Sequence, residues 1–122
     1  MLHYDVTDRV LGCLVKIHTA VGPGLAESSY QRAAALEFLA SGLAFVKEPI
    51  LEVRYRNVVI GHHRPDFIVE RKVVLELKCV STFDEVHTSQ VLTYLRITGL
   101  KVGLLVNFNV PTLKNGIKRI VL

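Results

Sequence analysis

Two short apolar runs, separated by a stretch with helical spacing, constrain the fold of this chain more than any other feature. The runs are residues 73–80, VVLELKCV, and residues 101–108, KVGLLVNF, and their length and β-branched content are typical of strands. The stretch between them repeats its apolar residues with the period of a helix that starts at Asp84 or Thr82 and stops at Gly99. Strand, helix and strand in this order predict a crossover connection, which places the two strands side by side and parallel.

Two more helices are expected near the start of the chain. Residues 7–22 carry apolar side chains at helical intervals, and the tripeptide Gly-Pro-Gly at residues 22–24 breaks the pattern. We expect the second helix over about residues 25–40, with Leu36 and Leu39 facing the core. Both helices therefore precede every strand of the chain.

The remaining segments are rich in β-branched and aromatic residues. Residues 44–55 and 58–69 are separated by Arg-Asn, and Glu-Arg-Lys separates the second run from residues 73–80. We expect these three runs to form successive strands of a meander, and residues 117–122 to form a final short strand. The order α-α-β-β-β-α-β-β predicts an α/β or α+β fold with a mixed β-sheet flanked by helices. A chain of 122 residues, 1–122, is long enough for a single domain of common size.

The composition and the charge of the chain indicate where the protein is located and which partners it can bind. Half of the residues are hydrophobic, yet no apolar run reaches the roughly 20 residues that cross a membrane, so we expect no membrane contact. The first ten residues are polar and acidic, unlike a signal peptide, and Cys13 and Cys79 lie in apolar segments, as buried thiols do. We therefore expect a cytoplasmic protein. The net charge of +4, from 15 lysines and arginines against 11 acidic residues, is compatible with a polyanionic partner.

Three charged residues interrupt the predicted strands. Because strand side chains alternate between the two faces, Glu76 and Lys78 lie on one face and are flanked there by valines. In the preceding run, Asp66 follows a proline, which lacks an N–H and marks a strand edge, a bulge or a break. If the two runs pair antiparallel through the intervening turn, Asp66 lies near Glu76 across the sheet.

The predicted closeness of Asp66 and Glu76 indicates a metal site. Two carboxylates on a partly covered face repel each other, and a divalent cation removes the conflict. Carboxylate oxygens with a backbone carbonyl and waters suit Mg²⁺ or Mn²⁺. In this interpretation Lys78 orients or helps to deprotonate a metal-bound water and stabilises charge on a phosphate. The simpler interpretation is an ion pair between Glu76 and Lys78 on a solvated face, with Asp66 following a turn.

The pattern of Pro65-Asp66 followed by Glu76-Leu77-Lys78 resembles the motif of the PD-(D/E)xK nuclease superfamily. The order helix, three strands, helix and strand is similar to the restriction-endonuclease-like core of that superfamily, αβββαβ, with an extra N-terminal helix and C-terminal strand here. Residues 24–30, GLAESSY, resemble the GxxExxY signature of a small bacterial family placed in the superfamily. Three further segments are similar to that family, so the resemblance covers nearly the whole chain: residues 61–64, 103–108 and 113–121.

This resemblance implies roles for individual residues. Asp66, Glu76 and the backbone carbonyl of Leu77 would be metal ligands, and Lys78 would be the catalytic lysine. Glu27 matches the acidic residue of the first core helix, which in such nucleases often reaches the metal shell through water. The alternative for Glu27 is that a carboxylate in the first turn of a helix favours the helix dipole without any metal.

Further residues would contact the nucleic acid. Gln90 and Tyr94 resemble the QxxxY motif of the recombination-type exonuclease branch, and at positions i and i+4 they project from one helical face toward a phosphate or the nucleic-acid backbone. Ordinary residues of an amphipathic helix would give the same pattern. Arg64 shares the strand face of Asp66 in the predicted meander and is the remaining candidate for a phosphate contact, with a structural salt bridge as the alternative. His87 lies one turn before Gln90 and could line the same groove, although a surface position is the simpler interpretation.

Three functions follow from these patterns. The first is a Mg²⁺-dependent phosphodiesterase that cleaves DNA or RNA by attack of an activated water, with DNA favoured over RNA. The second is a nucleic-acid-binding or protein-interaction module that keeps the nuclease fold without turnover and acts as a homodimer or beside a partner protein. The third is an assembly protein whose ionic face is an interface. We expect the first, because every residue that the chemistry requires is present.

Overall fold

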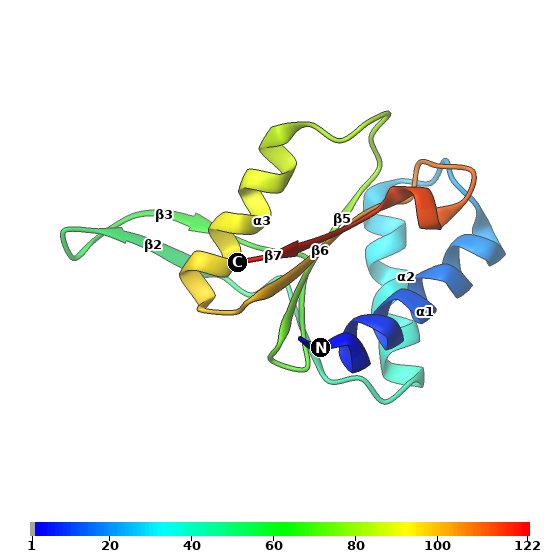
Figure 1. Ribbon diagram of the computed structural model, residues 1–122, viewed down its shortest axis with the longest axis horizontal. Coiled ribbons are helices and arrows are strands. Elements are labelled where there is room, and N and C mark those ends of the chain that lie inside the picture. The colour runs from blue at the N-terminus through cyan, green and yellow to red at the C-terminus, as the bar shows by residue number, and fades with distance from the viewer. Residues whose placement is uncertain (1) are drawn as a thin grey trace.

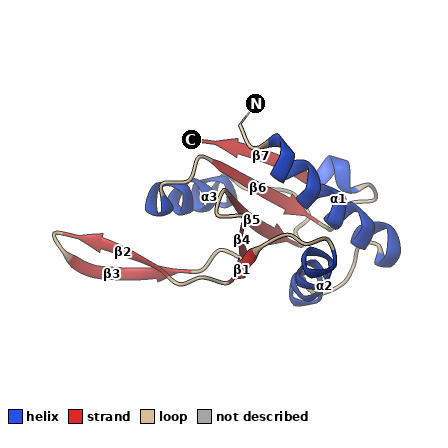
Figure 2. Cartoon of the chain, turned by 90° about the horizontal axis from the view of Figure 1, so that it is seen from below, coloured by secondary structure: helices blue, strands red, loops and turns tan. Residues whose placement is uncertain are grey.

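The computed structural model describes residues 2–122 as a five-stranded sheet between two layers of helices, with a separate β-hairpin (Figure 1, Figure 2). Helices α1 (Tyr4–Val21) and α2 (Glu27–Ala40) pack on one face of the sheet, and α3 (Glu85–Thr98) packs on the other. The sheet has the order β1-β4-β5-β6-β7, with the bounds β1 (Phe45–Lys47), β4 (Phe67–Val69), β5 (Val73–Lys78), β6 (Val102–Asn107) and β7 (Ile117–Val121). A short 3₁₀ helix, η1 (Leu113–Gly116), precedes β7.

The crossover predicted around α3 is present. Strands β5 and β6 pair in parallel, whereas the pairs β1–β4, β4–β5 and β6–β7 are antiparallel, so the sheet is mixed. The helix of the crossover is capped by Asp84, whose side chain accepts a hydrogen bond from the Val86 N–H, and it ends at Gly99 with φ 76°. The predicted α/β fold with a mixed sheet flanked by helices is confirmed, and it is the architecture of a restriction-endonuclease-like core.

The predicted three-strand meander is wrong. Each of the first two runs breaks at a proline, Pro49 or Pro65, and the four pieces form two different sheets. The two middle pieces in chain order, β2 (Leu51–Tyr55) and β3 (Val58–His63), pair only with each other as a hairpin, whereas β1 and β4 join the main sheet. Proline cannot donate a ladder hydrogen bond and restricts the residue before it, which explains why the strands end there. Both views show the hairpin extending away from the sheet (Figure 1, Figure 2).

The alternation of side chains along β5 separates two apolar clusters. Val73, Leu75 and Leu77 face α1 and α2, and Val74 faces α3 together with Val91 and other apolar side chains. Glu76 shares the face of Val74 and is therefore on the side of α3. Within residues 2–122, no helix is both long enough and apolar enough to span a membrane.

The prediction that Leu36 and Leu39 face the core is also wrong. These side chains are 69% and 68% exposed, and the buried residues of α2 are Tyr30, Ala34 and Phe38. The ring of Tyr30 stacks on Phe108 with centroids 4.1 Å apart, and Phe38 meets Phe67 edge-on. Because apolar residues occur on all sides of α2, helical periodicity alone could not identify the buried face.

Candidate active site

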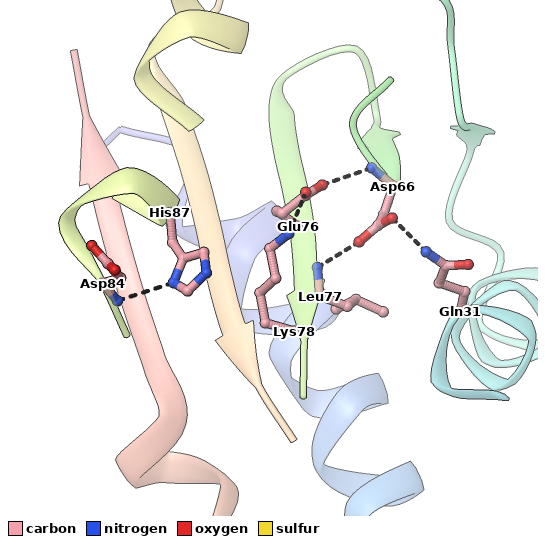
Figure 3. Close-up of polar contacts among 7 residues, drawn as sticks. All are labelled: Gln31, Asp66, Glu76, Leu77, Lys78, Asp84 and His87. Carbon is pink, nitrogen blue, oxygen red and sulfur yellow. Dashed lines mark hydrogen bonds and ion pairs between the residues drawn. The ribbon is translucent and has the colours of Figure 1, made fainter. Parts of the chain in front are cut away.

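The antiparallel register of β4 and β5 brings Asp66 next to Glu76. Phe67 pairs with Leu75, so the residue before β4 lies opposite Glu76. The Asp66 N–H donates to Glu76 Oε1 at 3.0 Å, and the Leu77 N–H donates to Asp66 Oδ2 at 2.7 Å. Figure 3 shows Asp66 between Glu76 of β5 and Gln31 of α2. A pair of carboxylates thus lies at the point where the main sheet meets α2.

Both carboxylates are buried, and burial changes their acidity. Asp66 is 7% exposed and Glu76 is 4% exposed. Burial, together with the charge of Asp66, raises the pKa of Glu76 to about 7, although Lys78 acts in the opposite direction. Burial also raises the pKa of Asp66, and the charge of Glu27 adds to this rise, whereas hydrogen bonds from Leu77 and Gln31 oppose it. Ionising both buried carboxyl groups is therefore unfavourable unless positive charge is added to that of Lys78.

Lys78 forms an ion pair with Glu76 on a covered face of the sheet. Its Nζ lies 3.3 Å from Glu76 Oε2, and the lysine side chain is only 17% exposed. The ion pair of the simpler interpretation is present, but the solvated face that this interpretation requires is not. A lysine held in this way places its ammonium group against Glu76, and its charge also lowers the pKa of Asp66.

Gln31 is a site residue that the sequence patterns missed. Its Nε2 donates to Asp66 Oδ1 at 2.5 Å, so α2 holds one oxygen of this carboxylate (Figure 3). Gln31 lies four positions after Glu27 and therefore projects from the same side of α2. This spacing is the only signal in the sequence that could have identified it.

Helix α3 brings Tyr94 close to the carboxylates. Tyr94 is buried, and burial, with the charges of Glu76 and Asp66, raises the pKa of its hydroxyl, while a hydrogen bond from Gln90 opposes the rise. Glu27 is also near, since its charge raises the pKa of Asp66. The structure thus brings the candidates from α2, β5 and α3 together around the Asp66–Glu76 pair.

Arg64 is the candidate that the structure does not bring into this cluster. It lies in the segment between β3 and Asp66 and is exposed, and among residues 2–122 no hydrogen bond or ion pair joins it to either carboxylate. Because β3 ends at His63, the continuous strand face that Arg64 was expected to share with Asp66 does not exist.

The donor atoms of the site fit a hard divalent cation. Within residues 2–122 no three side chains of His, Cys, Asp or Glu gather to hold a metal. A cation here would therefore depend on the two carboxylates, main-chain oxygen and water. Mg²⁺ is commonly bound in this way, through one or two carboxylates with several waters retained. The raised pKa values of Asp66 and Glu76 support the fit, because a cation would offset their repulsion.

The match to a protein-family model agrees with this motif. A family model described as the PD-(D/E)XK nuclease superfamily matches residues 4–120, and members of this superfamily generally use divalent metal ions. No curated protein matches the chain. One similar solved structure is the alkaline exonuclease LHK-Exo from Laribacter hongkongensis, with 13% identity, a TM-score of 0.46, and coverage of 99% of this chain and 71% of that one. Because the family model spans nearly the whole chain, the protein belongs to the PD-(D/E)XK nuclease superfamily.

Proposed function

We propose that this protein is a metal-dependent nuclease that cleaves phosphodiester bonds at the site of Asp66, Glu76 and Lys78. The observation that carries the proposal is the pair of buried carboxylates with a lysine Nζ 3.3 Å from one of them. Such an arrangement leaves charge uncompensated in a structural core, but it suits a site that binds a cation and a phosphate. Membership of the superfamily supports the same reaction.

The metal would be held by Asp66, Glu76 and the backbone carbonyl of Leu77, with Mg²⁺ as the proposed ion and Mn²⁺ as a substitute. When bound, the cation would polarise the phosphoryl group and lower the pKa of a coordinated water. Glu27, whose charge already acts on Asp66, would contact this site through water.

The side chains around the carboxylates would orient the substrate. The ammonium group of Lys78 would stabilise negative charge on the phosphate during attack. The raised pKa of Tyr94 keeps its hydroxyl protonated, so Tyr94 can donate a hydrogen bond to a phosphate oxygen. Gln90, one helical turn earlier, would contact the next part of the strand. The signature at residues 24–30 supports placing the chain in the GxxExxY family, and we favour DNA over RNA as its substrate.

The test is cleavage of labelled single- and double-stranded DNA and RNA with Mg²⁺, Mn²⁺ or EDTA. We expect cleavage to require the metal and to fall by about 10²-fold or more in Asp66→Ala and Lys78→Ala. Lys72→Ala is the matched control, because Lys72 is exposed in the turn before β5. Cleavage that survives both site substitutions would come from a contaminant. Metal-dependent binding without any cleavage would instead favour a catalytically silent binding module.

A further inference from the structure

A cleft of about 480 Å³ lies between the end of β3 and α3, and Gln90 is the one lining residue to which the proposed reaction assigns a role. It is lined by His63, Val86, His87, Ser89, Gln90 and Thr93. Every polar side chain in this lining can donate a hydrogen bond, and none is acidic. This chemistry contrasts with the carboxylate pair and suits an anionic or polar ligand.

The cleft adjoins the candidate active site. Gln90 lines it, and Tyr94, whose pKa responds to Glu76 and Asp66, follows four residues later on the same helix. Four residues of α-helix span roughly 6 Å. On the other wall, the ring of His63 lies 6.1 Å from the ring of Tyr94 between centroids. A ligand in the cleft would therefore lie beside the proposed scissile phosphate.

Both histidines of the cleft are held in defined positions. His87 Nδ1 accepts a hydrogen bond from the Asp84 N–H at 3.0 Å, so a neutral ring carries its proton on Nε2 and has a donor to offer (Figure 3). His63 pairs with Leu51 in the hairpin, and Leu51 packs against the apolar cluster under α3. The base of the hairpin is thereby fixed against the helix, with His63 between them.

We propose that this cleft binds an unpaired nucleotide of the substrate strand, next to the phosphodiester that is cut. Its volume lies in the range of small-molecule sites, and the rings of His63 and His87 can stack only on a base that is not already stacked within a duplex. The rings of His63 and His87 would contact the base by stacking, and the donors of the lining would bind its phosphate. This inference rests on the proposed nuclease function and adds to it a preference for single-stranded or frayed substrate.

The charge of the hairpin supports a polyanionic strand as the ligand. Residues 51–64 contain three arginines, at 54, 56 and 64, and one glutamate, at 52, which gives 3 − 1 = +2. These arginines are exposed. A strand that leaves the cleft along the hairpin would thus meet positive charge.

The experiment measures binding of a fluorescein-labelled single-stranded oligodeoxynucleotide by fluorescence anisotropy, with Ca²⁺ in place of Mg²⁺. We expect His63→Ala to weaken binding about tenfold, as loss of a stacking side chain does. His62→Ala is the matched control, because His62 is the exposed neighbour on the opposite face of the hairpin and should leave binding nearly unchanged. His87→Gln is the second variant, since Gln retains an acceptor for the Asp84 N–H and removes the ring. We expect it to weaken binding, and thermal melting verifies that each variant is folded.

Several results would overturn this inference. Unchanged affinity in both His63→Ala and His87→Gln, or an equal loss in His62→Ala, would show that the cleft does not hold the strand. A blunt duplex that binds as tightly as the single strand, with the same loss in His63→Ala, would exclude an unpaired nucleotide. Calorimetric titration with Mn²⁺ measures metal binding at the proposed active site, and so it tests the proposed nuclease function independently of the cleft. If the protein binds Mn²⁺ through Asp66 and cleaves nucleic acid, but His63→Ala does not weaken binding of the oligonucleotide, only the proposed role of the cleft is wrong.

Discussion

Every oxygen of the two buried carboxylates has a hydrogen-bond or ion-pair partner before a metal binds. Asp66 accepts from Gln31 and from the Leu77 N–H, and Glu76 accepts from the Asp66 N–H and is paired with Lys78. A carboxylate oxygen has two lone pairs, so each oxygen retains one for a cation. These partners orient the carboxylates in advance, which reduces the cost of assembling a metal site.

The first prediction at the scale of residues concerns the pH dependence of stability in EDTA. The pKa of Glu76 is raised from 4.5 to about 7, so its carboxyl is protonated in both folded and unfolded chains below pH 4.5. As the pH rises through this window, the unfolded chain ionises while the folded carboxyl retains its proton. The contribution of Glu76 to the free energy of unfolding should therefore fall by on the order of 3 kcal/mol by pH 7 and stay constant above it.

Glu76→Gln isolates this effect, because the amide cannot ionise but keeps an oxygen for the Asp66 N–H. Urea unfolding in EDTA measures the difference in the free energy of unfolding between the two proteins. The pH series runs from about 4 to 8, roughly the range in which carboxyl groups with ordinary and raised pKa values titrate. We expect the free energy of unfolding of Glu76→Gln to increase relative to that of the wild type as the pH rises. Parallel stability profiles of the two proteins against pH would mean that folding does not raise the pKa of Glu76.

The second prediction at this scale concerns Gln31. The Gln31 amide holds Asp66 Oδ1, and side chains that orient a metal ligand typically contribute roughly tenfold or more to metal affinity. We therefore expect Gln31→Ala to remain folded and to bind Mn²⁺ about tenfold more weakly. Calorimetric titration measures this, with Arg32→Ala, an exposed neighbour on α2, as the control. Tighter Mn²⁺ binding in Gln31→Ala would show that Gln31 competes with the metal.

The residues of the site differ in how far the sequence could predict them. Asp66, directly before β4, and Glu76, in β5, lie ten residues apart across a short turn, so local pairing rules bring them together. Gln31 reaches Asp66 across 35 residues of sequence, through the packing of α2 on the sheet. No local pattern encodes such a contact, because it depends on which face of α2 is buried, and the apolar residues of this helix occur on all of its sides.

The same distinction holds at the scale of elements. The limits of α3 were predictable because its cap at Asp84 and its stop at Gly99 are local signals. The partners of β2 and β3 were not, since each strand could pair with any exposed edge. Pro65 predicted a strand edge, a bulge or a break, but it did not indicate that the pieces of the two runs would separate into two sheets.

The prediction at this scale concerns the contact of β6 with α3. A Cβ on Gly103 would come within 2.5 Å of Val91 Cγ1, so in Gly103→Ala either the Val91 side chain must rotate or α3 must move away from the sheet. We expect a loss of about 1–3 kcal/mol in the free energy of unfolding. Because Val91 lies next to Gln90 in α3, we also expect slower cleavage. Urea unfolding and the nuclease assay measure the two effects.

Gly12→Ala is the matched control for this substitution. Gly12 lies within α1, and a Cβ there would have no atom within 4 Å. Alanine has the higher helix propensity, so this variant should gain about 0.5–1 kcal/mol and keep its activity. If Gly103→Ala were as stable as the wild type, Val91 and α3 could accommodate the added methyl group at no cost, and the contact of β6 with α3 would not be tightly packed.

At the scale of the whole molecule, the protein consists of a body with a buried sheet and an arm that is largely exposed. Every residue of β6 is buried, whereas no residue of the hairpin β2–β3 is. A two-stranded sheet has little stability of its own. The arm therefore depends on its base, where Leu51 and His63 meet α3.

The last prediction follows from this division and uses amide hydrogen exchange. Amides of β5 and β6 should exchange only through global unfolding, whereas those of the hairpin should exchange through local opening at a lower free energy. Within the hairpin, protection should decrease from His63 toward Arg56 at the turn. A single-stranded oligonucleotide in Ca²⁺ should slow exchange first at the base of the arm, if the strand enters between β3 and α3. Equal protection of hairpin and body would contradict the division. Protection that rises with protein concentration would mean that a second copy covers the exposed apolar side chains of the arm, Tyr55, Val58 and Ile60.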